Sequence, residues 1–188
     1  MISTTDFKRG KKIEFKGEPY EIIEFQHVKM QQRAPIVRTK LKSLKTGRVL
    51  EETFSAGDKF ETPSLEEKNM QFLYSQDEFC YFMDTESFEQ IPLTDAQLGD
   101  AKKFIKEGMT VQILYYKGEP LTVEPPMFVE LMVAETEPSF KGDTASGSNK
   151  PAKLESGAIV KVPFHIETGD VIRIDTRTSE YIEKVSGK

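Results

Sequence analysis

The 188-residue chain contains one cysteine, two histidines and no long apolar run. The single Cys80 excludes an internal disulfide and is typical of a reducing compartment. His27 and His165 are far apart in the sequence and have no partner at metal-ligand spacing, so we expect no metal site. No run approaches the roughly 20 apolar residues of a membrane-spanning helix, and residues 1–12 lack the apolar core of a signal peptide. We therefore expect a cytoplasmic protein that does not associate with membranes.

The sequence also lacks the motifs of common catalytic sites. It has no phosphate-cradling glycine motif, no cluster of metal ligands and no nucleophile paired with a histidine. Cys80 lies between Phe79 and Tyr81 in a strand-like run, which predicts a buried, inert thiol rather than a nucleophile. The sequence thus predicts that the protein is not an enzyme and has no catalytic residues and no cofactor.

Charge is distributed unevenly along the chain, although the total is only −5. Residues 1–64 carry 13 basic and 9 acidic residues, a net charge of +4, whereas residues 65–127 carry 5 and 12, a net charge of −7. Residues 128–188 carry a net charge of −2. A basic end on an acidic body suggests one end that meets phosphate groups, but +4 over 64 residues also fits an ordinary solvated surface.

Short alternating segments separated by turns indicate an all-β protein. The first segment, residues 1–64, alternates at 11–15, 20–25, 36–42 and 49–54, with glycine turns between, which is typical of an SH3-like barrel. Residues 65–127 and 128–188 each have the strands of a five-stranded oligonucleotide-binding (OB) barrel. In the second segment we also expect one short helix over residues 98–106, and in the third we expect strands at 128–134, 158–166, 171–175 and 180–185.

Residues 29–35 lie between two strands of the first segment and predict an exposed hairpin tip. Arg and Lys beside long amide side chains suit contacts to phosphate and ribose. A loop that merely joins two strands remains the alternative. The residues of the tip that we consider for binding are Lys29, Met30, Gln31, Gln32 and Arg33.

Residues 142–150 are rich in glycine, serine and threonine, and they predict an exposed loop. Its glycines allow a close approach of the backbone to a partner, and its hydroxyls can bond phosphate or ribose. A simple flexible linker remains the alternative.

Residues 150–169 contain a pattern at fixed spacing, which consists of Lys150, Ala152, Gly157, Val160, Val162, Pro163, Ile166 and Gly169. This pattern resembles the C-terminal signature of bacterial elongation factor P. Further matching runs lie throughout the chain, at residues 17–20, 28–29, 38–41, 87–90, 125–126, 128–131, 141–145 and 179–181. The resemblance therefore covers essentially the whole chain.

This resemblance implies a fold and a function. The family has an SH3-like (KOW-like) domain followed by two OB barrels, arranged as an L that imitates tRNA. Its members bind the bacterial ribosome between the peptidyl and exit sites, contact peptidyl-tRNA, and promote peptide-bond formation where consecutive prolines stall synthesis. We accordingly expect a monomer whose partners are the ribosome, peptidyl-tRNA carrying proline, and mRNA at the exit site.

In the family the first hairpin tip reaches the acceptor end of the tRNA, and a Lys or Arg there is often enzymatically extended. Here Met30 and Gln31 replace the usual Pro and Gly, Gln32 falls on the modified position, and Arg33 follows. Because glutamine has no amine to acylate, we expect no such modification at Gln32. Either the tip works unmodified, or a one-residue change in its conformation brings Arg33 forward.

The resemblance also implies two further contact regions. The loop near the exit-site codon comprises Gly142, Asp143, Thr144, Ala145 and Gly147, and the terminal motif that contacts tRNA or the small subunit contains Tyr181 and Lys184. Two other functions stay open. One is an elongation factor P-like paralogue, and the other is a general RNA-binding OB-fold protein, which would need exposed aromatic platforms.

Overall fold

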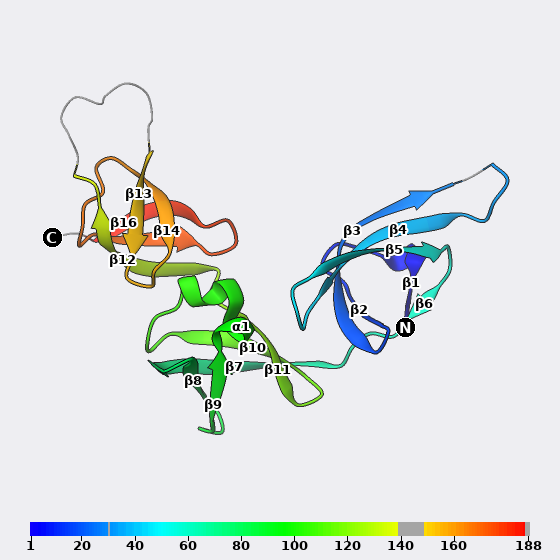
Figure 1. Ribbon diagram of the computed structural model, residues 1–188, viewed down its shortest axis with the longest axis horizontal. Helices are drawn as coiled ribbons and strands as arrows, with labels where there is room; N and C mark the ends of the chain where they lie inside the picture. The colour runs from blue at the N-terminus through cyan, green and yellow to red at the C-terminus, as the bar shows by residue number, and fades with distance from the viewer. Residues whose placement is uncertain (30, 139–148, 187–188) are drawn as a thin grey trace. The chain divides into compact units, whose positions relative to one another are not determined.

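The computed structural model describes residues 1–29, 31–138 and 149–186 (Figure 1). The chain forms two compact units. One comprises Met1–Glu66 with Leu114–Thr122, and the other comprises Glu67–Ile113 with Val123–Lys188.

The first unit is built around a four-stranded antiparallel sheet in the order β2-β3-β4-β5. Its strands are β2 (Lys12–Phe15), β3 (Glu18–Val28), β4 (Ile36–Ser43) and β5 (Val49–Ser55). Two very short strands, β1 (Ile2–Ser3) and β6 (Lys59–Phe60), pair with each other, and the 3-10 helix η1 (Thr4–Asp6) follows β1. The core consists of Phe7, Ile13, Tyr20, Ile22, Val37, Leu41 and Phe54. The four predicted strands are therefore confirmed, whereas β1 and β6 are too short for a periodic pattern.

The sequence Lys-Gly-Glu-Pro occurs twice, and both copies form a hairpin turn of the same kind. Lys16 and Gly17 have φ values of 53° and 78°, and Lys117 and Gly118 have values of 51° and 80°. Two successive residues with positive φ form the turn that matches the right-handed twist of paired strands. The repeat thus reflects shared turn chemistry.

The middle of the chain forms a five-stranded sheet in the order β11-β10-β7-β8-β9. Its strands are β7 (Leu65–Gln76), β8 (Phe79–Asp84), β9 (Gln90–Thr94), β10 (Thr110–Tyr116) and β11 (Glu119–Glu124). Phe72 and Phe82 are buried on its inner face, with ring centroids 5.2 Å apart. Strand β9 was not predicted, because Pro92 interrupts its pattern. Proline is tolerated here because β9 is an edge strand.

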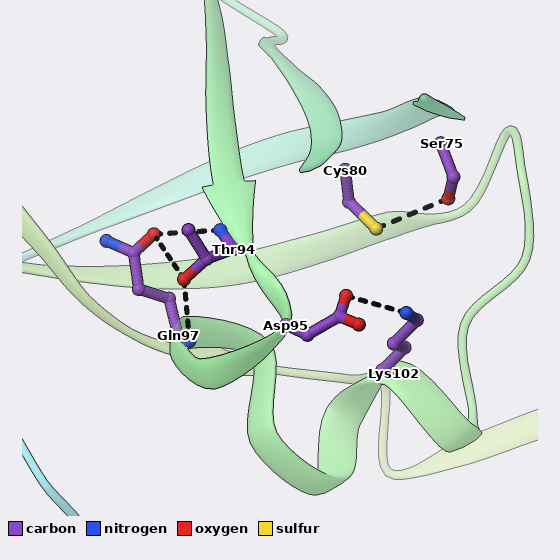
Figure 2. A network of polar contacts seen from close by, with 6 residues as sticks. All are labelled: Ser75, Cys80, Thr94, Asp95, Gln97 and Lys102. Carbon is purple, nitrogen blue, oxygen red and sulfur yellow. Dashed lines mark hydrogen bonds and ion pairs between the residues drawn. The ribbon is translucent and has the colours of Figure 1, made fainter. Parts of the chain in front are cut away.

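The prediction of a single helix over residues 98–106 is wrong. The structure has a four-residue helix α1 (Asp95–Leu98) followed by a 3-10 helix η2 (Gly99–Lys103). Thr94 caps α1, because its hydroxyl accepts a hydrogen bond from Gln97 N while the Gln97 side chain accepts one from Thr94 N (Figure 2). Gly99, with φ of 53°, ends the α-helix.

The only cysteine lies close to this helix. Cys80 is buried, as predicted, and its sulfur lies 3.3 Å from the hydroxyl oxygen of Ser75 (Figure 2). Asp95 and Lys102 form an ion pair across the two short helices, with 2.6 Å between Asp95 Oδ1 and Lys102 Nζ.

The last part of the chain forms another five-stranded sheet, in the order β14-β13-β12-β15-β16. Its strands are β12 (Phe128–Thr136), β13 (Asn149–Leu154), β14 (Ile159–Pro163), β15 (Val171–Asp175) and β16 (Glu180–Ser186). The prediction that residue 150 belongs to an exposed loop is wrong. Lys150 lies in β13 with only 2% of its surface exposed, and its ammonium donates a hydrogen bond to the Glu137 carbonyl over 2.6 Å.

A side chain from the middle of the sequence completes the core of this last sheet. Phe104, 6% exposed, follows η2 and packs in one cluster with buried residues of the last sheet, among them Val129, Leu131 and Ile166. Lys106 Nζ forms an ion pair with Glu155 Oε1 over 3.2 Å, and the Ser156 hydroxyl donates to the Lys103 carbonyl. Within the second unit, the segment after η2 therefore contributes directly to the stability of the last sheet.

The all-β prediction is confirmed, with one small barrel-like domain and two curled five-stranded sheets. The domain boundaries at residues 1–64, 65–127 and 128–188, and the L-shaped arrangement, stay predictions. Among the described residues, no helix is long and apolar enough to cross a membrane.

Candidate functional site

The predicted tip lies at the end of a long hairpin made by β3 and β4 (Figure 1). Strand β2 pairs with β3 only as far as Glu21, whereas β3 continues to Val28, about 23 Å further at about 3.3 Å per residue. Strand β5 pairs with β4 from Lys42 to Ile36 and so supports the hairpin almost to its end. The hairpin is thus a paired arm that holds Lys29 and residues 31–35 at its far end.

All described residues of the tip are exposed. They are Lys29, Gln31, Gln32, Arg33, Ala34 and Pro35. Met30 lies outside the described residues. The carbonyl of Pro35 accepts a hydrogen bond from Ala56 N over 2.9 Å, which ties the returning strand to the turn after β5. The tip therefore presents two amides and two cations on an anchored base.

Charged side chains on the arm behind the tip form a cross-strand row over β3, β4 and β5. Lys40 Nζ lies 2.9 Å from Glu24 Oε2 and 3.9 Å from Glu51 Oε1. The hydrogen bond and charge of Lys40 lower the pKa of Glu24, and those of Glu24 raise the pKa of Lys40. Arg38 lies in the next row, opposite the neutral Gln26 and Thr53. Lys40 is thus already neutralised, while the positive charge nearer the tip comes from Lys29, Arg33 and Arg38.

The second predicted contact region lies outside the described residues. It comprises Gly142, Asp143, Thr144, Ala145 and Gly147, and its role stays a prediction.

The third predicted region, at the C-terminal strand β16, is described. Tyr181 is half-buried and packs against the core of the last sheet. It also lines a groove together with Asn149, Ile159 and Lys161. Lys184 Nζ forms an ion pair with Asp170 Oδ2 over 2.9 Å, and Asp170 is buried. Both residues therefore have structural contacts, whatever else they bind, and sequence reasoning did not predict this pairing because Asp170 lies in a distant turn.

Burial, hydrogen bonds and nearby charges act in opposite directions on the pKa of Asp170. Burial by itself would raise the pKa of Asp170, but a hydrogen bond from Glu167 N and the ion pair with Lys184 outweigh it. The pKa of Asp170 is therefore lowered below its ordinary value of 3.8. A carboxyl group with a lowered native pKa stabilises the fold above its unfolded pKa, and this stabilisation disappears as the pH falls through the native pKa.

Replacing Lys184 by methionine should destabilise the last sheet at pH 7. The difference from the wild type should shrink as the pH falls below 3.8 and through the lowered native pKa of Asp170, because the ion pair is lost once this carboxyl group is protonated. Urea unfolding between pH 7 and 2.5 measures this. The exposed Lys153→Met in β13 is the control and should change stability little at any pH. A difference between Lys184→Met and the wild type that stays constant over the whole pH range would contradict the role given to the ion pair.

Comparisons with known proteins agree with this architecture. Three family models match in succession: the elongation factor P KOW-like domain at residues 3–60, the elongation factor P OB domain at 65–123, and the elongation factor P C-terminal domain at 129–184. Elongation factor P of Thermodesulfovibrio yellowstonii is 72% identical over 185 residues, covering 98% of this chain and 99% of that protein. Elongation factor P of Natranaerobius thermophilus is 57% identical over the full length of both chains.

A solved structure shares the fold at much lower identity. It is described as eukaryotic translation initiation factor 5A from Methanococcus jannaschii, with a TM-score of 0.54 and 18% identity over 65% of this chain and 92% of that one. The fold and the family models together define the class of protein, which is a translation factor and not an enzyme. Within that class, the chain belongs to the elongation factor P family.

Proposed function

We propose that this protein binds the ribosome between the peptidyl and exit sites, contacts peptidyl-tRNA, and stimulates peptide-bond formation where consecutive prolines stall synthesis. It works in the cytoplasm as a monomer. The observation that carries the proposal is the exposure of residues 29 and 31–35 at the end of a paired arm, in a domain that matches the elongation factor P KOW-like family model.

The mechanism is positional. Arg33 and Lys29 offer charged donors to phosphates, and Gln31 and Gln32 offer donors and acceptors to ribose or base edges. A rigid arm that holds the acceptor end of the tRNA lowers the entropic part of the barrier, while the ribosome supplies the chemistry. About 1.4 kcal/mol of better alignment gives roughly a tenfold increase in rate. One or two hydrogen bonds from the tip are worth about that much.

Gln32 stands where the family has a modified cation, so the positive charge of this tip comes from unmodified side chains. Arg33 is the nearest cation to that position in the sequence and is exposed. We propose that Arg33 supplies the charge that an extended Lys or Arg supplies in other members.

A reconstituted translation system tests the proposal. Addition of the purified protein should increase the yield of a reporter that contains three consecutive prolines and should leave a proline-free reporter unchanged. An equal effect on both reporters, or no effect on either, would contradict it. The relatives reported above are named elongation factor P rather than a paralogue, which favours this function over that of a paralogue.

A further inference from the structure

The outward face of β7, β8 and β9 carries aromatic side chains where a solvent-facing sheet normally carries charged ones. The pairing register puts Tyr74, Tyr81 and Pro92 in one cross-strand row. The rings of Tyr74 and Tyr81 are stacked, with centroids 4.8 Å apart and planes inclined by 22°. The row on one side consists of Gln76, Phe79 and Thr94. The row on the other side consists of Gln71, Met83 and Gln90. We call these nine residues, none of which is charged, the aromatic face.

The aromatic face is not needed for the core of its own sheet. Phe72, Cys80, Phe82 and Leu93 fill the inner side and are buried. Tyr74 and Phe79, in contrast, keep 40% of their surface exposed. The outward aromatic residues are therefore additional apolar surface, beyond what folding of the sheet uses.

The other two sheets provide an internal comparison. In the first domain an outward row consists of Glu24, Lys40 and Glu51, which form ion pairs. In the last sheet the row of Glu130, Arg173 and Glu183 is also ion-paired, with 2.8 Å between Arg173 Nη2 and Glu130 Oε1. Of these three rows, all from described residues, two are ion-paired. Only the row of the middle sheet is aromatic.

A turn beside this face carries a further exposed aromatic residue. Phe88, between β8 and β9, is 69% exposed and has a φ of 61°, which is rare for a bulky residue. The turn from Asp175 to Glu180 has the same backbone hydrogen bond, from Ser179 N to Asp175 O, and Ser179 there has a φ of 60°. Since Ser179 adopts in its turn the conformation that Phe88 adopts here, this turn conformation does not require phenylalanine.

Acidic residues surround the aromatic face. Asp77 and Glu78 form the turn between β7 and β8, and Glu86 and Glu89 lie in the turn between β8 and β9, all of them exposed. The segment 65–127 carries a net charge of −7. The negative charge of this segment repels nucleic-acid phosphates and attracts Lys and Arg side chains. These cations also bind favourably over tyrosine rings.

We propose that the aromatic face docks a protein segment rich in Lys and Arg. The inference deepens the proposed function and depends on it, because we place the partner segment on a protein of the ribosome. Aromatic anchors encircled by complementary charge are the usual energetic centre of such an interface.

Photo-crosslinking identifies the occupant. Benzoylphenylalanine in place of Phe79 should, on purified ribosomes, crosslink to a protein at a segment containing Lys or Arg. Crosslinks to RNA alone, or none from a bound protein, would overturn the inference and leave the proposed function standing. Failure of the wild-type protein to bind ribosomes at all would overturn both.

A charge substitution gives an independent measurement. The double variant Tyr74→Lys with Phe79→Lys should bind ribosomes about tenfold more weakly, because it places cations against a basic partner. If RNA occupied the face, the same variant would bind more tightly, which would overturn the inference. Val49→Lys, at an exposed apolar residue of β5, is the matched control and should bind as the wild type does. Thermal unfolding confirms that each variant is folded.

Discussion

Replacing both Gln32 and Arg33 by alanine should slow peptide-bond formation at consecutive prolines by about tenfold relative to the wild-type factor, while the melting temperature stays unchanged. Both side chains are exposed at the end of the β3–β4 arm, so their removal exposes no core. The loss of two or three contacts to RNA, each worth about 0.5–1.5 kcal/mol, accounts for an effect of this size. Single-turnover measurements of dipeptide formation with prolyl-tRNA would resolve it.

The matched control lies at the opposite end of strand β4. Thr46→Ala with Arg48→Ala alters a polar residue and a cation in the exposed turn between β4 and β5. This variant should keep the wild-type rate. An unchanged rate in the tip variant, or an equal loss in both variants, would refute the assignment of the tip.

The largest expected effect on stability is that of Phe104→Ala. Phe104 is buried among residues of the last sheet although it follows η2 in the middle of the sequence. Removing a buried phenylalanine leaves a cavity and costs about 3–5 kcal/mol. Hydrogen exchange measured at the amides of Val160 and Val162, which belong to the same cluster, should show the loss of protection.

Phe88→Ala is the control for this prediction, because it makes the same substitution at an exposed position. It should change the free energy of unfolding by less than about 0.5 kcal/mol. If Phe104→Ala left the exchange of the last sheet unaltered, the place of Phe104 in that core would be wrong.

Local patterns allowed most strands to be predicted, since their side chains alternate between a buried and an exposed face. Strand β15 (Val171–Asp175) was predicted to the residue, and the ends of β4 and β5 to within one residue. The tip was predicted because a polar run interrupts two such strands. In each case the local pattern of apolar and polar side chains was enough to indicate the element, although β15 pairs with the distant strand β12.

The failures have physical causes of a different kind. Lys150 was placed in a loop because it follows a Gly- and Ser-rich run, and its burial depends on the Glu137 carbonyl, which the sequence does not bring near. The helix at 98–106 was misjudged because Gly99 adopts a positive φ and divides it. Phe104 was not expected in the last core, since its partners are contributed by a different sheet. The pairing of Lys184 with Asp170 likewise depends on tertiary structure.

The aromatic face could not be predicted from the sequence alone, because it depends on the pairing register of β7, β8 and β9. The aromatic residues of β8 do not all face outward, since Phe82 is buried while Phe79 is exposed. Only the pairing of Tyr74 with Tyr81 and of Tyr81 with Pro92 shows that the outward members form one continuous row.

The most direct test of the central claim is a cryo-electron microscopy reconstruction of this protein on a ribosome stalled at consecutive prolines. The account predicts density for the β3–β4 arm with Gln32 and Arg33 against the acceptor end of the peptidyl-tRNA. A factor bound at another place on the ribosome, or an arm that points away from that acceptor end, would contradict it.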